Sequence, residues 1–450
     1  MQVKALREVN IWVINVSLIK KISMNSILNN FSWLLLQKIT QLLSSLVVGI
    51  LLARYFGAAN YGIYSVILAI TTVASSLSTV GLNHLITKEL KNNKNNTQVV
   101  ISNAIVLRFL GGLSSLILFS GVALLVLDKV YVGFVLFILF LQIFSGLKVV
   151  EYYFLSISYM KPYIIANVIV MISSIVTKVI FVYFSIDIAY FLYLLGIDYL
   201  LAGILSYKIY RSRIERDKND FYDKKVAIPL LKKGLPLLLS SVTAIIYLKL
   251  DVIMLSYFTT NEEVGSYAVA ARLSEIWYMF PTLVASSLFP KLLELRNENY
   301  QKYERGLDLS LYFLSFTAFV IACFISIFAE FIVTLLFGME YINSVDVLRI
   351  HIWSGIFIFM RAIASKWFIA EDYYYLSFFT HSAGAITNVI LNMILIPLYG
   401  AIGAAVATLI SYAMASYLSL FLTKNGRFLA VKMTYAVFWP SFFLKFRKYK

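Results

Sequence analysis

The sequence predicts an all-α polytopic membrane protein with about twelve transmembrane helices in two six-helix lobes. The chain is 60% hydrophobic with a mean hydropathy of +0.82, whereas soluble domains contain roughly 45–50% apolar residues. Apolar runs of helix length recur along it, and basic residues concentrate in alternate loops. A short motif also occurs twice, about half a chain apart, as in many transporters.

Apolar segments long enough to cross a bilayer, which takes about 20 residues, form two sets of six. The first set lies at 31–53, 61–86, 99–127, 131–157, 163–184 and 188–210. The second set lies at 234–258, 264–290, 307–329, 346–370, 376–397 and 400–422. We therefore expect an N-terminal lobe over 31–210 and a C-terminal lobe over 234–422.

The stretches outside the lobes are rich in charge. We expect residues 1–30 to be a cytoplasmic N-terminal segment, 211–233 a solvated cytoplasmic linker, and 423–450 a basic cytoplasmic tail. Translation starts either at Met1 or at Met24, and the sequence leaves this choice open. Lysine and arginine are abundant in the loops on this side and nearly absent from the opposite loops, so both termini are expected in the cytoplasm.

The repeated motif relates the two halves. Residues 55–64 read YFGAANYGIY and residues 257–267 read YFTTNEEVGSY, so each has Tyr-Phe followed by Gly-x-Tyr. The offset of about 200 residues is close to half the chain, and internal repeats of this kind are common in membrane transporters. We therefore expect the two lobes to be related by an internal repeat.

Enzymatic and metal-binding motifs are missing from the sequence. Cys323 is the single cysteine, which excludes an intramolecular disulfide or a Cys-rich metal site. The three histidines are far apart, and no Gly-x-x-x-x-Gly-Lys loop is present to bind ATP. We expect no catalytic residue, no metal and no cofactor. The net charge of +16 reflects the loop bias of a membrane protein, so a nucleic-acid partner is not expected.

Charged residues deep inside the apolar segments are the candidate functional residues. Such a charge costs about 2.5–3.5 kcal/mol on insertion scales and marks a polar path or a partner. Four acidic residues lie there with six basic ones, and the cationic excess would attract an anion. The basic residues are Arg108, Lys148, Lys178, Lys249, Arg272 and Arg361, and Lys38 joins the candidates through a polar stripe on the first helix. Ion pairing that only holds helices together is the alternative, notably for Lys148 with Glu151 and Arg272 with Glu275, which are three residues apart. The substrate-binding candidates are Arg272, Lys249, Arg108, Lys38, Lys178 and Arg361. The candidates for a coupling ion are Glu275, Asp251, Glu151 and Asp198.

Three blocks of sequence together resemble one transporter family. They are residues 33–64, residues 251–281 with EEVGSYAVAARLSEIWYMFP, and residues 388–408 with NVILNMILIPLYGAIGAAVAT. These blocks are similar to the Wzx-type O-antigen and polysaccharide flippases of the multidrug/oligosaccharidyl-lipid/polysaccharide exporter superfamily. The resemblance implies two lobes arranged as a V around a solvated cationic cavity, in a bacterial inner membrane.

The resemblance also implies a substrate and partners. A flippase of this kind turns an undecaprenyl-pyrophosphate-linked oligosaccharide, an O-antigen or capsule unit, from the cytoplasmic to the periplasmic leaflet by alternating access. The pyrophosphate would bind to Arg272, Lys249 and Arg108, while H⁺ or Na⁺ would be the coupling ion. Membrane lipids, and a complex with a polymerase and a chain-length regulator, are the further partners expected.

Other functions stay open at this point. A cation-coupled multidrug antiporter of the same superfamily would favour an acidic cavity, whereas the deep charges here are net basic. A membrane O-antigen polymerase would need a sizeable periplasmic loop with catalytic basic residues, and the loops on that side are short. A sugar transporter of the major facilitator class lacks support, because residues 87–98 carry no Gly/Asp/Arg signature.

Overall fold

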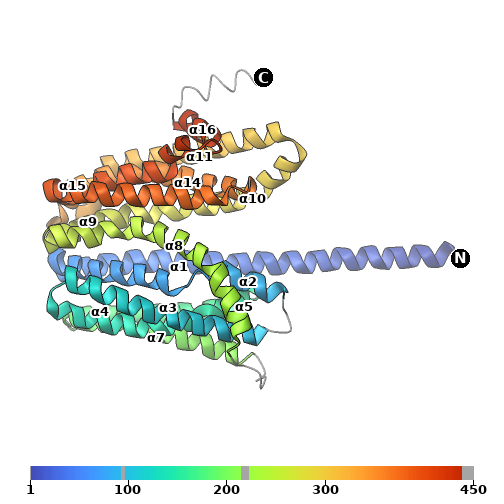
Figure 1. The fold of residues 1–450 in the computed structure, drawn as a ribbon, viewed down its shortest axis with the longest axis horizontal. Helices are drawn as coiled ribbons and strands as arrows, with labels where there is room; N and C mark the ends of the chain where they lie inside the picture. The colour runs from blue at the N-terminus through green and yellow to red at the C-terminus, as the bar shows by residue number, and fades with distance from the viewer. Residues whose placement is uncertain (1, 93–96, 214–221, 438–450) are drawn as a thin grey trace.

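The structure, a computed structural model, describes residues 2–92, 97–213 and 222–437, and the regular structure within these ranges is helical throughout. Figure 1 shows two stacked groups of helices, the first built from the first half of the chain and the second from the remainder. The N-terminal part of α1 projects from one end of the molecule. The predicted all-α class is confirmed.

The first half of the chain forms seven α-helices and one 3₁₀ helix within the described ranges. They are α1 (Gln2–Ser78), α2 (Asn83–Asn92), α3 (Thr97–Val126), α4 (Lys129–Gln142), η2 (Ile143–Val150), α5 (Glu151–Ser156), α6 (Lys161–Tyr183) and α7 (Ile188–Arg211). The fourth predicted span is thus interrupted by η2. Small residues permit tight packing there, since a Cβ on Gly203 would lie 2.2 Å from the Phe144 carbonyl oxygen.

The second half begins with a long helix and continues in shorter ones. The α-helices are α8 (Lys224–Phe258), α9 (Asn261–Glu275), α10 (Met279–Glu298), α11 (Tyr300–Ile327), α12 (Ala329–Leu336), α13 (Ser344–His351), α14 (Ser354–Ala370), α15 (Tyr374–Ser416) and α16 (Arg427–Val437). The 3₁₀ helices between them are η3 (Ile276–Tyr278), η4 (Met339–Tyr341) and η5 (Leu418–Leu422).

Two glycines account for the number of membrane crossings. Ten stretches in the described part of the chain are long and apolar enough to span a bilayer. Two of them contain a glycine with positive φ, Gly57 (φ 71°) in α1 and Gly400 (φ 55°) in α15. Glycine adopts this conformation at little cost, and each of these stretches turns there into a second crossing. Ten stretches therefore make twelve crossings, as the sequence predicted.

Helices extend into all three stretches that were expected outside the lobes, and α16 (Arg427–Val437) lies in the predicted tail. α1 begins at Gln2, so the backbone of the expected N-terminal segment is continuous with the first crossing. α8 begins at Lys224, inside the stretch expected as a solvated linker, because the Asp223 side chain caps the Lys225 amide at 2.8 Å. Ala227 and Leu230 are buried three residues apart on one face of this helix, so its first turns pack against the first half.

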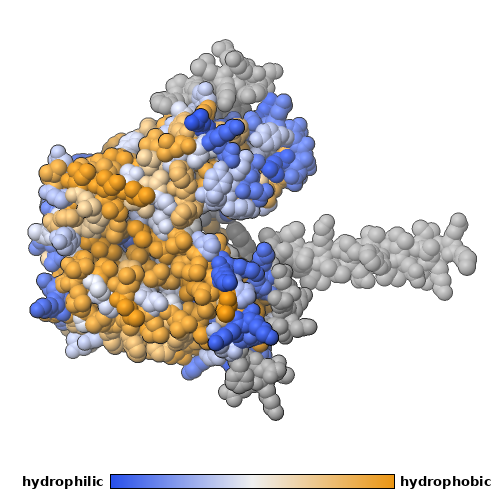
Figure 2. All heavy atoms as spheres, viewed as in Figure 1, coloured by the Kyte–Doolittle hydropathy of each residue, from blue (hydrophilic) through white to orange (hydrophobic). Residues whose placement is uncertain are grey.

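The buried core shows that the two halves share one apolar cluster at one end, whereas at the other end the first turns of α8 pack against the first half. One apolar cluster mixes residues of both halves, including Leu52 and Ile67 with Leu255 and Val264. Beyond it the core divides, into a cluster formed mainly by the first half and another formed by the second half alone. We call these ends the shared end, which contains Gly57 and Gly400, and the open end. Figure 2 shows the halves separating toward the open end, with apolar residues over much of the outer surface.

Candidate functional site

At the shared end the repeated motifs of the two halves are in direct contact. A Cβ on Gly62 would lie 2.0 Å from the Asn261 carbonyl oxygen, and one on Gly265 would lie 2.1 Å from the Ala58 carbonyl oxygen. The backbones of α1 and α9 therefore touch where both motifs place glycine. Small residues at such crossings let helices approach closely inside a membrane. The sequence repeat thus supplies the surface that closes this end.

Polar contacts between the halves reinforce that closure. The amide of Ala58 donates to Glu340 Oε1 at 2.7 Å, and the Tyr341 hydroxyl donates to the Ala53 carbonyl at 2.9 Å. The Arg54 guanidinium donates to the carbonyl oxygens of Leu335 and Leu336. These contacts satisfy backbone groups left free by the kink at Gly57 and by the end of α12.

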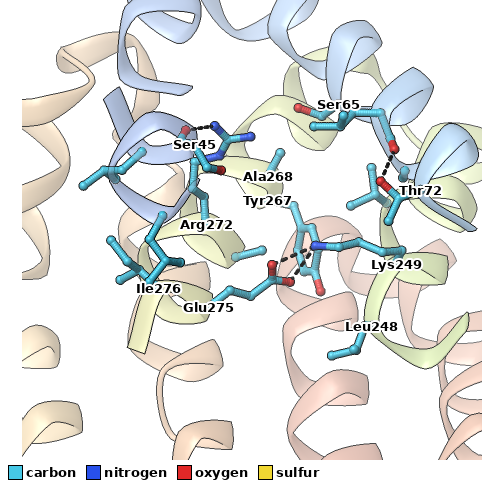
Figure 3. A pocket seen from close by; sticks show the side chains of 16 residues that line it. Ser45, Ser65, Thr72, Leu248, Lys249, Tyr267, Ala268, Arg272, Glu275 and Ile276 are labelled. Carbon is cyan, nitrogen blue, oxygen red and sulfur yellow. Dashed lines mark hydrogen bonds and ion pairs between the residues drawn. The ribbon is translucent and has the colours of Figure 1, made fainter. Parts of the chain in front are cut away.

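A cavity of about 310 Å³ lies between the halves, with α1 on one side and α8 and α9 on the other. Its polar lining includes Ser45 and Thr72 of the first half and Lys249, Arg272 and Glu275 of the second. Figure 3 shows Arg272 and Lys249 directed into this space from different helices, with Glu275 beside Lys249. Two of the predicted substrate-binding residues and one predicted ion-coupling residue therefore line the same cavity.

Arg272 reaches across the cavity to the first half. Its Nη1 donates to the Ser45 carbonyl at 2.7 Å, and its guanidinium carbon lies 5.8 Å from the centre of the Tyr61 ring. The side chain passes over Gly49, where an added Cβ would lie only 1.8 Å from Nη1. Within the described residues Arg272 takes part in no ion pair. It is the uncompensated cation of the cavity.

Lys249 and Glu275 neutralise one another. Lys249 Nζ lies 2.7 Å from Glu275 Oε2 and 3.0 Å from Oε1, and both side chains are about 30% exposed. Glu275 therefore pairs with a residue of the neighbouring helix α8 rather than with Arg272, its neighbour in sequence. The cavity retains one net positive charge, carried by Arg272.

Asp251 lies inside the second half, where it does not itself line the cavity but contacts Tyr267, which does. It is 2% exposed and accepts hydrogen bonds from Tyr267 at 2.8 Å and Thr408 at 2.6 Å through Oδ2. Asn388 and Asn392 donate to its Oδ1 at 2.7 and 2.6 Å. Asn392 Oδ1 is buried and lacks a hydrogen-bond partner. The two asparagines were not among the predicted residues, although their spacing of four residues on an apolar helix places them on one face.

Lys178 and Asp198 form a separate cluster inside the first half. Lys178 Nζ lies 3.5 Å from Asp198 Oδ2, and the Ser174 hydroxyl lies between them at 2.8 Å from Nζ and 2.6 Å from Oδ2. Lys178 is 6% exposed. The structure therefore pairs a predicted substrate-binding residue with a predicted ion-coupling residue and does not bring them to the cavity.

Arg361 lies in the interior of the second half. Its Nη1 donates to Thr380 Oγ1 at 2.6 Å and to the Ala415 carbonyl at 2.9 Å, next to the end of α15. The negative end of the helix dipole stabilises a cation at that position, and the cation donates a hydrogen bond to a terminal carbonyl. Its Nε and Nη2 are buried without a hydrogen-bond partner, and Arg361 does not line the cavity.

The remaining predicted residues lie in the first half on the open-end side. Lys38 is exposed on α1, whereas Arg108 is 8% exposed and donates to Asn83 Oδ1 at 2.6 Å. Glu151 accepts a hydrogen bond from the Tyr163 hydroxyl at 3.1 Å. The alternative pairing of Lys148 with Glu151 is not formed within the described residues.

Comparison with known proteins identifies the family. A family model described as "Polysaccharide biosynthesis protein" matches residues 27–296, which is more than half of the chain and includes the cavity. The chain belongs to the polysaccharide biosynthesis protein family. As a family member with ten apolar stretches of membrane-spanning length, it is a multi-pass membrane protein.

Relatives and solved structures agree with this assignment. The chain is 30% identical over 190 residues to the "Probable low-salt glycan biosynthesis flippase Agl15" of Haloferax volcanii, a match that covers 41% of this chain and 40% of that relative. It superposes on "Lipid II flippase MurJ, inward closed conformation" with a TM-score of 0.67 and 17% identity, over 89% and 91% of the two chains. It also superposes on an inward-facing MATE multidrug transporter of the MOP superfamily with a TM-score of 0.67 and 16% identity. That match covers 88% of this chain and 95% of the transporter. This family member therefore has the MOP-superfamily fold.

Proposed function

We propose that this protein is a flippase for a lipid-linked oligosaccharide, and that it works by alternating access between its two halves. The observation that carries the proposal is Arg272, an unpaired guanidinium in a cavity between the halves of a polysaccharide biosynthesis family member. A guanidinium binds phosphate through two parallel hydrogen bonds, and it does so strongly where little water competes. Transport requires binding and release of this kind and no bond chemistry.

The cavity suits the headgroup of such a substrate better than its tail. A pyrophosphate bound by Arg272 would attract Lys249, whose ion pair with Glu275 is about 30% exposed and open to exchange. The polyprenyl tail would stay in the surrounding lipid and the sugars in the open space between the halves. We propose undecaprenyl pyrophosphate as the carrier and an O-antigen or capsule unit as the glycan.

We assign the open end to the cytoplasm, on the basis of the basic residues that sequence analysis placed there. The substrate would then enter from the inner leaflet of a bacterial inner membrane and leave after the shared end opens. Movement of negative charge outward from a negative interior releases about 2.3 kcal/mol per charge per 100 mV. The membrane potential therefore favours the proposed direction of transport.

Asp251 is our proposed site for a coupling cation. Its carboxylate is buried with no basic residue among its hydrogen-bond partners, while Thr408, Asn388 and the unpartnered Asn392 Oδ1 supply further oxygen atoms. Oxygen ligands of this kind suit a hard cation such as Na⁺, and protonation of Asp251 would neutralise the site equally. Glu275 in the cavity is the second candidate, since its release from Lys249 would couple substrate binding to ion binding.

The test of the substrate proposal is Arg272→Ala in a strain that lacks the endogenous gene. We expect loss of surface polysaccharide, accumulation of the lipid-linked unit in the inner leaflet and unchanged protein in the membrane fraction. Arg272→Lys keeps the charge but not the planar fork, and should restore only part of the activity. Normal polymer in the alanine variant would remove Arg272 from the site. Single repeat units on the surface would instead indicate a polymerase, and altered drug sensitivity alone a multidrug antiporter.

A further inference from the structure

Two membrane crossings of the second half lose regular α-helical structure partway along. One passes from α9 through the 3₁₀ helix η3 to α10, and the other has two turn residues, Ile352 and Trp353, between α13 and α14. The amide of Gly355 bonds three residues back, to the Ile352 carbonyl at 3.0 Å. A 3₁₀ stretch inside a long helix often marks a functional hinge. We call these two places the α9–α10 break and the α13–α14 break.

The two breaks lie side by side and are joined by hydrogen bonds around His351. His351 Nδ1 lies 2.6 Å from the hydroxyl oxygen of Ser274, which precedes the α9–α10 break. At the far end of that break, the Tyr278 hydroxyl lies 2.9 Å from Ser354 Oγ, and Ser354 donates to the His351 carbonyl at 2.6 Å. Because the Ser354 proton is used in that bond, Tyr278 is the donor to Ser354. These four residues, which we call the His351 cluster, hold the two breaks together.

The His351 cluster is closed to solvent. Ser274, His351 and Ser354 are each at most 1% exposed. The Ser274 hydroxyl donates to carbonyls of its own helix at 3.0 Å, so it accepts its second hydrogen bond from His351 Nδ1. The His351 ring also packs edge-on against Tyr267 and Tyr412, with ring centres 5.8 and 6.5 Å apart. Hydrogen bonds that are paired and buried in this way favour one defined arrangement of the breaks.

The apolar core of the second half divides at the same level. Before the breaks, α9 and α13 contribute Leu273 and Leu348 to the cluster shared with the first half. After the breaks, α10 and α14 contribute Ala285 and Phe359 to the cluster formed by the second half alone. We call the part of the second half built on this second cluster the open-end block. α11 and α15 contribute to both clusters and connect the open-end block to the shared end.

The α9–α10 break also borders the cavity. Ile276 of η3 lines it, directly after Glu275 and about one turn after Arg272 (Figure 3). The direction of both charged side chains therefore depends on the geometry of this break. Glu275 pairs with Lys249 of α8, so a change of angle at the break would move the carboxylate relative to that lysine.

We propose that the two breaks form a hinge within the second half, and that His351 is the positioning residue that holds it. With the His351 cluster formed, Arg272 and Glu275 face the cavity as they do here. When the cluster opens, the open-end block swings and redirects them. This inference rests on the proposed function, because it names a part that moves during transport. In a hinge a few residues at element ends absorb the motion, while the packed blocks on either side stay rigid.

The test measures the separation of the halves at the open end in the full-length protein in nanodiscs. In a Cys323→Ala background, spin labels on the exposed positions Lys88→Cys in α2 and Gln301→Cys in α11 report this distance. Ser274→Ala removes the bond to His351. Ser315→Ala is the matched control, because it removes a buried hydroxyl that bonds within the open-end block. We expect Ser274→Ala to raise the population of a second distance about two- to tenfold and the control to leave the distribution unchanged.

Two substitutions of His351 separate its hydrogen bond from its packing. His351→Asn keeps a donor close to the position of Nδ1 and loses the ring, whereas His351→Phe keeps a ring and loses the donor. His351→Asn should retain the wild-type distances and polysaccharide export. His351→Phe should give the distances of Ser274→Ala and reduced export. The reverse order would show that the ring acts only by packing, and would refute the positioning role.

Arg272→Ala separates this inference from the proposed function. It should lose export while the distance between the open-end labels stays that of the wild type, because Arg272 is not part of the His351 cluster. If Ser274→Ala gives the same distances as Ser315→Ala, the hinge is refuted while the flippase proposal stands. If Arg272→Ala exports normally, the flippase site itself is refuted.

Discussion

Glu340 is expected to hold the shared end closed, because its carboxylate caps a helix of the opposite half. Its Oε1 accepts a hydrogen bond from the Ala58 amide at 2.7 Å, and Ala58 directly follows the kink at Gly57. The second half contains the same arrangement within itself, where Glu263 Oε2 accepts from the Ala401 amide at 3.0 Å after Gly400. One carboxylate therefore joins the halves and the other does not, which makes the two variants a matched pair.

Loss of a helix N-cap costs about 0.5–2 kcal/mol. The hydrogen bond between Glu340 and the Ala58 amide is lost when the halves separate. Glu340→Ala should therefore raise the equilibrium constant for opening at the shared end by about two- to thirtyfold. Glu263→Ala removes a similar bond that both states retain. It should lower the unfolding temperature without moving that equilibrium.

The assay is a spin-label distance measurement across the shared end. With Cys323 replaced by alanine, labels on cysteines at positions 129 and 346 report the separation of the two halves there. Glu340→Ala should enrich long distances, Glu340→Gln should do so less because its amide oxygen still accepts, and Glu263→Ala should match the wild type. Equal distance distributions in the two alanine variants would refute the reasoning.

Three further changes test the buried site, the cavity and the C-terminal helix. Asp251→Asn should abolish stabilisation of the protein by Na⁺, measured as the Na⁺-dependent shift in unfolding temperature, because it removes the buried charge. Gly49→Val should displace the Arg272 side chain and eliminate export at normal protein levels, whereas Gly121→Ala, with nothing within 4 Å of its Cβ, should be neutral in the same assay. Lys432→Met should lower stability by about 3–5 kcal/mol in thermal unfolding, because it removes the buried cation that pairs with Asp308 at 2.9 Å and with Glu304 at 3.5 Å.

Each of these results has an opposite that would count against it. An unchanged Na⁺ response in the Asp251 variant would remove that carboxylate from the coupling site. Full export by the Gly49 variant would show that Arg272 can act from another position. Unaltered unfolding of the Lys432 variant would mean that the apolar face of α16 suffices to anchor it.

The sequence predicted the membrane crossings well because hydropathy and loop charge are local properties. The predicted span 163–184 corresponds to α6 (Lys161–Tyr183), and 99–127 corresponds to α3 (Thr97–Val126). The sequence did not predict that α8 begins as early as Lys224. Those first turns are stabilised by burial against residues of the opposite half, which local hydropathy does not report.

Of the predicted site residues, Lys249, Arg272 and Glu275 line one cavity, and each was selected because it is a charge within an apolar run. Their roles in binding stay predictions. The same signal selected Arg361, which caps a helix end instead. The free-energy cost of burying a charge depends on the charged residue itself and can be read from the sequence. The partner group that offsets this cost can come from any helix that packs nearby, so the sequence does not identify it.

By itself, the sequence determined that this chain spans a membrane about twelve times, that its halves repeat, and that its buried charge is net positive. Each follows from composition and spacing along the chain. Only the tertiary structure decided that Glu275 pairs with Lys249 and that Asp251 is surrounded by Tyr267, Asn388, Asn392 and Thr408. It also decided that Arg272 forms no ion pair with any other described residue. The physical reason is that a charge inside a membrane is stabilised by groups within a few ångströms, and those groups come from helices far apart in sequence, such as Thr408 for Asp251, 157 residues away, and Ser45 for Arg272, 227 residues away.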